Sequence, residues 1–415
     1  MKQTLWTRNF TIITLGTLIS AIGGVAMGLA LSFVVFDQTS STWLSGLFSA
    51  ASILPGITLP LLLSPVIDRC NRKRLIVGLD YLSGVLYLLF GLCIRTTGFQ
   101  YGLYMLFNFC IGCIGSIYGL TYDCWYPDLI PPGMEQKGYS VTSLIYPLTT
   151  TLVTPIAAIV YERWGVELLI FTEGILLLTA ATLEGFIQWT PTGPAPSSAS
   201  WTTRIRSYAT DLAAGFRYLK KEPGIRNIYT YMAITNASGN ANNLMAMAHF
   251  QSSDGLTTTM YSLLTSAETI GRTLGAAVHY LFHIPQKHRY KLTVQVYMLY
   301  EIFDGILLYV AFPVMLVLRF ACGFLGVNTA TLRQAAVQSY LPSDLRGRVN
   351  GLFSVIVSLG MLVIRLLAGA LGEWLPYRVV ALLMASATFC CILWFIVRNR
   401  KDVQRIYEYE RPASS

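Results

Sequence analysis

The chain has 415 residues, of which 54% are hydrophobic and only 12% are charged. Soluble domains carry charge on about a quarter of their residues, so this composition excludes an ordinary soluble protein and indicates one that crosses a membrane repeatedly. The formal net charge of +9 comes largely from loops between apolar stretches. It reflects membrane orientation rather than nucleic-acid binding.

About twelve apolar stretches, each near the roughly 20 residues that a transmembrane helix needs, follow one another along the chain. They lie near residues 10–36, 43–66, 75–94, 101–126, 139–160, 168–189, 226–250, 258–283, 292–311, 313–337, 349–371 and 378–397. The first follows Lys2 and Arg8 like a secretory signal, but its apolar part is too long and offers no convincing cleavage site. We therefore expect a retained helix and an all-α membrane protein.

Basic residues are divided unevenly between the loops. The N-terminal end, every second loop and the C-terminal tail carry most of them, whereas the opposite loops hold only Arg95, Arg163 and Arg378. Because loops rich in lysine and arginine stay in the cytoplasm, both termini are expected to be cytoplasmic. We expect a multi-pass monomer in the cell (plasma) membrane, in contact with the lipid bilayer and without a nucleic-acid partner.

The longest polar interval divides the apolar stretches into two equal sets. It begins as a Pro/Ser-rich linker and continues with apolar residues at helical spacing, which predicts an amphipathic helix on the membrane surface. Those residues are Ile205, Tyr208, Leu212, Phe216 and Leu219. The expected domains are an N-terminal bundle at 1–189, the cytoplasmic linker at 190–224, a C-terminal bundle at 225–397 and a cytoplasmic tail at 398–415.

The two halves of the sequence repeat each other. A constant offset of 211 residues aligns LFNFCIGCIG with VLRFACGFLG and superposes Gly112 on Gly323. The same offset carries Pro131 onto Pro342. A single register that holds over about fifty residues indicates an internal duplication.

The segment SPVIDRCNRKRL, between the second and third stretches, resembles the loop signature Gly-x-x-x-Asp-Arg/Lys-x-Gly-Arg-Arg/Lys of major facilitator transporters. Asp68, Arg69, Arg72 and Lys73 match the signature, whereas a serine and Asn71 replace its glycines. YLPSDLRGRVNGLFS is similar to the matching segment of the enterobactin-exporter and macrolide-efflux branch. The resemblance implies twelve transmembrane helices in two pseudo-symmetric six-helix bundles, which move a small molecule by secondary transport.

The chain departs from the family pattern in the fifth stretch. The antiporter signature expects Gly-Pro followed by paired glycines, whereas the segment TPIAA keeps only the proline, Pro155. The resemblance also implies a cytoplasmic gate between the signature loop and the start of the eleventh stretch. The candidate gate residues are Asp68, Arg69, Arg72, Lys73, Asp123, Arg346 and Arg348, with Asp128 as a further partner. Simple anchoring of the basic residues at the inner membrane surface is the alternative.

Ionisable residues occur within the apolar stretches of the second half, where each costs about 2.5–3.5 kcal/mol on insertion scales. They are Glu268, Arg272, Glu301, Asp304, Arg319 and Arg365. Glu268 and Arg272 are four residues apart, so they share a helix face and can pair. One interpretation is a self-neutralising buried network. The other is a translocation path in which Glu268, Glu301 or Asp304 is the proton-coupling acid.

Asparagines in ITNASGNANNLMAM form a polar stripe on the seventh stretch. Asn236, Asn240 and Asn243 recur at helical spacing, and Met245 follows them. Amides can bind varied polar groups and methionine offers adaptable apolar surface, so the stripe is a candidate substrate cavity. Hydrogen bonds between helices are the alternative.

Several other residues are expected to have structural roles. The pairs Gly24/Gly28 and Gly271/Gly275 have the GxxxG spacing that lets helices approach closely. Three further acids, Asp80, Glu173 and Glu184, lie near enough to the membrane surfaces to snorkel toward water.

No metal or cofactor site is expected. His279, His283 and His288 cluster without nearby cysteines, and Cys110 and Cys113 have CxxC spacing without a second pair. The chain contains no GxxxxGK[ST], GxGxxG, HExxH or GxSxG motif, so we do not expect an enzyme.

The leading hypothesis is a secondary active transporter that exports a small amphipathic solute or drug in exchange for protons by alternating access. The second is uptake or exchange of an anionic solute bound by Arg272, Arg319 and Arg365. An intramembrane enzyme or a lipid-flipping protein is the third.

Overall fold

The computed structural model describes residues 4–67, 70–131, 134–189, 210, 213–281, 285–342 and 345–409. Within these ranges the regular elements are helices and no strand occurs. The chain divides into two compact units. The first contains Met1–Ser40 and Leu47–Trp201, and the second contains Ser41–Gly46 and Thr202–Ser415.

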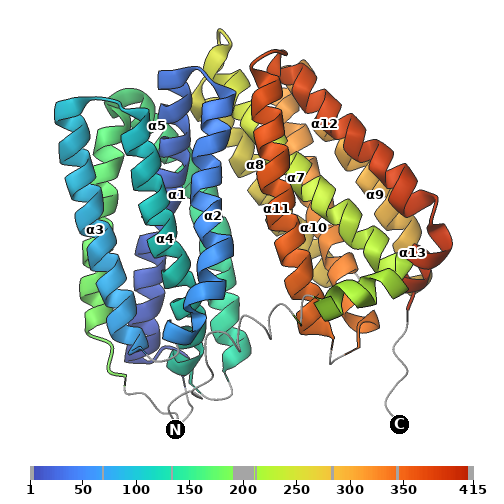
Figure 1. Ribbon diagram of the computed structural model, residues 1–415, viewed down its shortest axis with the longest axis horizontal. Helices are drawn as coiled ribbons and strands as arrows, with labels where there is room; N and C mark the ends of the chain where they lie inside the picture. Colours follow the sequence, from blue (N-terminus) through green and yellow to red (C-terminus); the bar gives the residue numbers. More distant parts are fainter. Residues whose placement is uncertain are drawn as a thin grey trace. The chain divides into compact units, whose positions relative to one another are not determined.

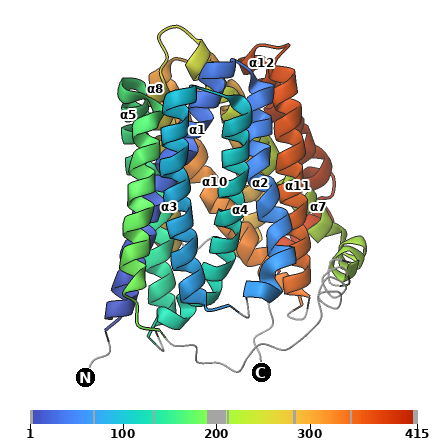
Figure 2. The ribbon, with the colours of Figure 1, turned by 60° about the vertical axis from the view of Figure 1, so that its left-hand side comes forward.

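The first unit is a helical bundle (Figures 1 and 2). Its elements are α1 (Arg8–Thr39), α2 (Thr42–Ile67), α3 (Arg72–Thr97), α4 (Tyr101–Trp125), the 3₁₀ turn η1 (Tyr126–Leu129) and α5 (Glu135–Gly185). α5 contains two helices, because Gly165 interrupts it with φ 77° and ψ −179°. This left-handed backbone favours glycine. The break lies between the fifth and sixth predicted stretches.

The second unit follows the same order of long helices, coloured from yellow-green to red in Figure 1. Its elements are α7 (Pro223–Ser252), α8 (Thr258–Leu281), α9 (Gln286–Ile306), η2 (Leu307–Tyr309), α10 (Phe312–Tyr340), α11 (Arg346–Gly372), α12 (Tyr377–Cys391), the π-helical turn η3 (Ile392–Val397) and α13 (Arg400–Tyr407). The predicted all-α fold with 12 long helices is confirmed.

Nine helical stretches of the described residues are long and apolar enough to cross a membrane. The two helices of α5 count as one of them, and neither α7 nor α8 is included. α7 carries the asparagine stripe and α8 carries Glu268 and Arg272, and such polar residues lower the hydropathy of any window that contains them. Both helices outside this set therefore carry candidate site residues.

Glycines confirm the internal repeat at the level of helix packing. A Cβ atom at Gly112 of α4 would lie 3.2 Å from the backbone of Ser52 in α2. At the repeated position, a Cβ atom at Gly323 of α10 would lie 2.1 Å from the carbonyl oxygen of Glu268 in α8. The same register therefore brings equivalent helix pairs together, and the contact is closer in the second unit.

The two predicted GxxxG contacts have different outcomes. A Cβ atom at Gly271 or Gly275 would lie 2.2 or 2.6 Å from backbone oxygens of α10, which confirms the close approach of α8 and α10. The expectation for Gly24 and Gly28 is wrong, since no described atom lies within 4 Å of a Cβ there. GxxxG spacing fixes a helix face but does not reveal whether another helix covers it.

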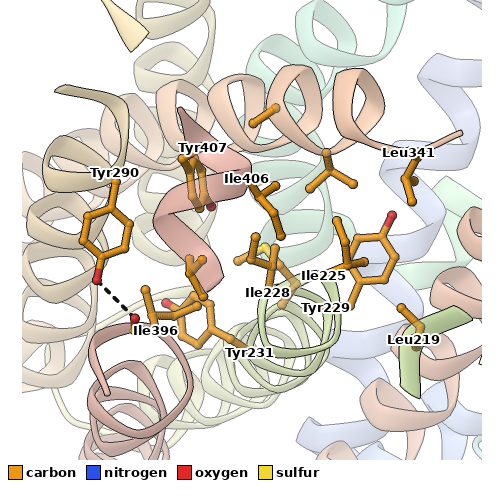
Figure 3. Packing of buried hydrophobic residues seen from close by; sticks show 14 of the residues in the cluster. Leu219, Ile225, Ile228, Tyr229, Tyr231, Tyr290, Leu341, Ile396, Ile406 and Tyr407 are labelled. Carbon is orange, nitrogen blue, oxygen red and sulfur yellow. Dashed lines mark hydrogen bonds between the residues drawn. The ribbon is translucent and has the colours of Figure 1, made fainter. Parts of the chain in front are cut away.

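The last helix, α13, packs into the core of the second unit, although the sequence predicts only a tail there. Val403, Ile406 and Tyr407 belong to a buried cluster with residues of α7, α9 and α10. Figure 3 shows this cluster, with the Tyr290 hydroxyl donating a hydrogen bond of 3.1 Å to the Ile396 carbonyl. Burial raises the pKa of Tyr407 well above its usual value, so that its hydroxyl stays neutral.

Ile406→Ala is expected to destabilise the protein by about 2–5 kcal/mol, because it leaves a cavity where the side chain is 0% exposed. Thermal unfolding of the detergent-purified protein measures the effect. Lys401→Ala is the matched control, since Lys401 lies on the exposed face of the same helix. Equal melting temperatures for the two variants would contradict the docking of α13.

The described part of the linker is helical at residues 213–221. Phe216 is exposed, whereas Leu219 is buried in the core of the second unit. Ile205, Tyr208 and Leu212 lie outside the described residues. The amphipathic pattern therefore serves partly to attach this helix to the bundle.

Candidate functional site

The second unit contains a cavity of about 410 Å³. Its lining comes from α7, α8, α9, α10 and one residue of α11. Six of the predicted residues line it, namely Asn236, Asn240, Asn243, Glu268, Arg272 and Arg319. The sequence did not single out four other lining residues, which are Tyr231, Tyr297, Tyr300 and Arg333. The volume is within the range of small-molecule sites.

Arg319 of α10 is the centre of the charged network. Its Nε lies 2.9 Å from Oε2 of Glu268 in α8, and its Nη1 lies 2.7 Å from Oδ1 of Asp304 in α9. Its Nη2 donates to the Asn243 side chain of α7. The Arg319 side chain is only 7% exposed. One guanidinium thus joins four helices and balances two buried carboxylates. Its planar fork of N–H donors makes this possible, and a lysine ammonium has no such fork.

The predicted pair on α8 is confirmed. Arg272 Nη2 lies 2.5 Å from Glu268 Oε1. However, the Arg272 side chain is 61% exposed, so Arg319 is the more buried partner of Glu268. Arg272 presents its charge to the cavity that it lines.

The two acids of α9 differ in their partners. Asp304 accepts a hydrogen bond of 2.5 Å from Asn242 in addition to its ion pair with Arg319. Glu301 is 4% exposed and accepts a hydrogen bond of 2.8 Å from Thr235. It forms no ion pair with a described residue. Glu301 is therefore the acid of this network that lacks a direct cationic partner.

Arg365 of α11 does not join the acids. Its Nη1 donates a hydrogen bond of 2.7 Å to the Asn240 side chain, and its buried Nε has no hydrogen-bond partner among the described residues. The charge of Arg365 is therefore held beside the cavity by an amide that lines it.

The asparagine stripe faces the cavity, but the predicted methionine does not. Asn236 and Asn243 are exposed, and all three stripe asparagines line the cavity. The expectation for Met245 is wrong, since its side chain is 0% exposed and its sulfur lies 3.2 Å from the Cβ position at Gly372. Met232 and Met361 line the cavity instead. Met245 follows Asn243 by two residues, and residues two apart point to nearly opposite faces of an α-helix.

Arg333 is a cavity residue that the sequence did not reveal. It lies on α10, fourteen residues after Arg319, and such a separation returns to nearly the same face of a helix. Its Nη1 contacts the sulfur of Met232. Helical periodicity from Arg319 was the signal that could have found it.

The profile of the Major Facilitator Superfamily matches residues 13–300 and 292–414. The chain belongs to the major facilitator superfamily. It is therefore a multi-pass membrane protein of a transporter family.

Solved structures show the same fold at low sequence identity. The nucleoside transporter NupG has a TM-score of 0.69 and 12% identity, over 97% of this chain and 100% of that chain. A bacterial homolog of the lysosomal transporter Spinster has a TM-score of 0.65 and 12% identity, over 98% of each chain. A POT family transporter in complex with 5-aminolevulinic acid has a TM-score of 0.67 and 11% identity, over 95% and 96%. No curated protein sequence matches this chain.

The first unit of this major facilitator protein has no arginine where Arg319 stands in the second. The 211-residue offset pairs Arg319 with Asn108. Asn108 donates a hydrogen bond of 2.7 Å to the backbone carbonyl of Phe48 in α2. The fold therefore accepts a neutral amide at this position, which indicates that the charged network is a property of the second unit rather than a requirement of the superfamily fold.

Three acids of the first unit do not snorkel as the sequence predicts. Asp80 and Glu173 are each 4% exposed, and Glu184 is 0% exposed. The two glutamates are buried because α1 presents glycines to them: a Cβ at Gly16 would lie 2.4 Å from Glu184 Oε1, and one at Gly23 would lie 1.4 Å from Glu173 Oε2. The expectation of snorkelling was wrong because closeness to a helix end does not show which way a side chain points.

The described gate residues have local partners. Arg72 donates to the Cys124 carbonyl at 2.9 Å and lies 3.1 Å from Asp128. Lys73 donates to the Gly185 carbonyl at 2.7 Å. Asn71, which replaces a signature glycine, caps α3 by accepting a hydrogen bond from the Arg74 backbone at 3.1 Å.

Asp123 and Arg348 are exposed. Asp68 and Arg69 lie outside the described residues, as do the side chains of Arg346, His279 and His283.

Proposed function

We propose that this protein is a proton-coupled secondary active transporter that moves a small solute by alternating access. The polar cavity of the second unit supports this proposal. Asparagines, tyrosines and arginines line it beside the ion pairs of Arg319 with Glu268 and Asp304, which are buried where charge is costly. A major facilitator protein binds its substrate near the middle of the bilayer, and the residues of this cavity occupy the middle parts of α7, α8 and α10.

The cavity favours a small amphipathic solute with a group that accepts hydrogen bonds. Asn236, Asn240 and Arg272 offer donors, whereas Tyr231, Tyr297 and Met361 offer flat or flexible apolar surface. A volume of about 410 Å³ limits the solute to the size of a typical small molecule.

Glu301 is the proposed proton-coupling acid of this cavity. Glu268 and Asp304, the other two candidates, are held by Arg319. Glu301 contacts hydroxyl groups, which can hydrogen-bond to either protonation state of a carboxyl group. In Glu301→Gln, a pH gradient is expected no longer to accelerate solute flux. Solute exchange without a pH gradient is expected to continue. Gradient-driven flux in this variant would contradict the assignment.

Outward transport is part of the proposal, and it rests on the resemblance to the enterobactin-exporter and macrolide-efflux branch. The same proposal places the monomer in the plasma membrane with both termini in the cytoplasm. The pair of Arg72 and Asp128 then lies at the inner surface as one side of a cytoplasmic gate. Asp68, Arg69, Lys73, Asp123, Arg346 and Arg348 are the other proposed members of the gate.

Flux through proteoliposomes tests the function. A panel of neutral, cationic, anionic and zwitterionic compounds is measured with and without an imposed pH gradient, in both protein orientations. The proposal expects solute movement against its gradient, opposite to the proton flow, and its loss in Asn240→Leu. Product formation, or lipid scrambling without solute flux, would contradict it.

Uptake or exchange of an anionic solute is the second candidate, and the unbalanced arginines favour it. Arg333 and Arg365 form no ion pair with a described acid. Arg319 is no longer a candidate ligand of the anion, because two carboxylates occupy its guanidinium. Loss of anion flux in both Arg365→Gln and Arg272→Gln, with neutral compounds never transported, would favour this function over export of an amphipathic solute.

A further inference from the structure

The first unit buries three carboxyl groups, two of them against α1. Figure 2 shows α3 and α5 side by side with α1 next to them, and α5 is in contact with both α1 and α3. Asp80 comes from α3, whereas Glu173 and Glu184 come from the second helix of α5. Gly16 and Gly23 of α1 leave room for the two glutamate side chains.

Asp80 and Glu184 contact each other through their side chains. Both oxygens of Glu184 and Oδ2 of Asp80 are buried and have no hydrogen-bond donor among the described residues. Two carboxylate groups in contact repel one another, and both groups only accept hydrogen bonds when ionised. A proton between them removes one charge and supplies the missing donor.

The groups around the pair are neutral or acidic. Tyr118 and Tyr122 are close enough to Glu184 to feel its charge, and Glu173 lies eleven residues earlier in the same helix. The facing side of α1 contributes glycines and Ser20, whose hydroxyl is buried without a described partner. The nearby cation of α3, Lys73, donates to the Gly185 carbonyl instead.

We propose that Asp80 and Glu184 bind one proton between them and form a second protonation site of the transport cycle, in the first unit and separate from Glu301. This role in transport rests on the proposed proton-coupled function, whereas the binding of the proton rests on the geometry of the pair. Among the described residues, no arginine forms an ion pair with these acids, in contrast to Glu268 and Asp304 of the second unit.

A proton fits this site better than a metal ion. Sodium-like and calcium-like cations need several oxygen ligands around an open centre. Within the described residues, no group of three or more acidic, histidine or cysteine side chains is arranged to hold a metal. The Glu184 carboxyl also lies too close to α1 for an intervening ion, since it would be 2.4 Å from a Cβ at Gly16.

Loss of the proton links this site to movement of α1. The ionised pair would have two negative charges without a described donor, next to a face of α1 that carries glycine rather than a cation at the position closest to Glu184. Separation of α1 from α5 admits water to the carboxylates and relieves the repulsion. The position of α1 is therefore expected to depend on pH through Asp80 and Glu184.

Infrared spectroscopy of the purified protein in lipid nanodiscs tests proton binding without any solute. We expect a carbonyl stretch of a protonated carboxyl group at neutral pH, and a component of that band to disappear in both Glu184→Gln and Asp80→Asn. Glu167→Gln is the matched control, because Glu167 is an exposed acid of the same α5 segment. An unchanged band in the two pair variants would overturn the inference, and so would a band removed by NaCl but retained in choline chloride.

Hydrogen exchange of α1 tests the link to movement. After correction for the intrinsic effect of pH, raising the pH is expected to increase exchange in α1 at least several-fold in the wild type and in Glu301→Gln, but not in Glu184→Gln. Equal responses in all three proteins would overturn the inference. If both tests succeed while no compound shows flux driven by a pH gradient, the proton site stands and the proposed transport function fails. If both tests fail while a pH gradient drives solute flux, the transport function stands and the proposed proton site is wrong.

Discussion

Arg319→Met is expected to abolish transport and to destabilise the second unit by about 3–5 kcal/mol, the usual effect of breaking a buried ion pair. Methionine fills much of the volume but removes the cation that balances Glu268 and Asp304. Both carboxylates would remain buried, with only Arg272, Asn242 and their own hydration to compensate. Transport should fail because α8 and α9 lose their common partner at the cavity.

Thermal unfolding and proteoliposome flux measure these two effects. Arg272→Met is the control for stability alone, since its side chain is 61% exposed and exposed ion pairs contribute only about 0–1 kcal/mol. Adding Asp304→Asn to Arg319→Met removes one of the unpaired buried charges, so the double variant should recover part of the lost stability. A variant as stable as the wild type, or a double variant less stable than either single one, would contradict the central role of Arg319.

Gly323→Ala is expected to separate α10 from α8 and to reduce transport at least tenfold. The new methyl group would lie 2.1 Å from the Glu268 carbonyl oxygen and 3.1 Å from the Arg272 backbone nitrogen. These are backbone atoms, so a rotamer change cannot relieve the clash. Overpacking of this kind typically destabilises by about 1–3 kcal/mol, and here it also displaces the two charged residues of α8.

Gly351→Ala provides the control, because no described atom lies within 4 Å of a Cβ at that position in α11. Alanine favours a helix over glycine by about 1 kcal/mol, so Gly351→Ala should be neutral or slightly stabilising. Melting temperature and solute flux are compared for both variants. If the two variants behave alike, the close approach of α8 and α10 does not position the site.

The sequence was sufficient for the features that depend on neighbours along the chain. Apolar length predicted the helices, and the 211-residue offset predicted that Gly112 and Gly323 have equivalent roles. The four-residue spacing predicted the pair of Glu268 and Arg272. Each of these follows from the helix period and from helix length alone.

Contacts between different helices could not be predicted from spacing along the sequence. Arg319 reaches Glu268 and Asp304 across 51 and 15 residues of sequence, and no spacing rule indicates such partners. Burial of Glu184 depends on Gly16, which is 168 positions away. The same limit applies to α13, whose apolar face is visible in the sequence but whose docking partner is not.

The arrangement around Arg319 also restricts how the second unit can change shape. Sliding one of α7, α8, α9 or α10 past another would separate charged groups at a depth where water is scarce, and this would be costly. These four helices should therefore rock as a single rigid body during transport. Bending would then concentrate in α11, which contributes a single residue, Met361, to the cavity lining.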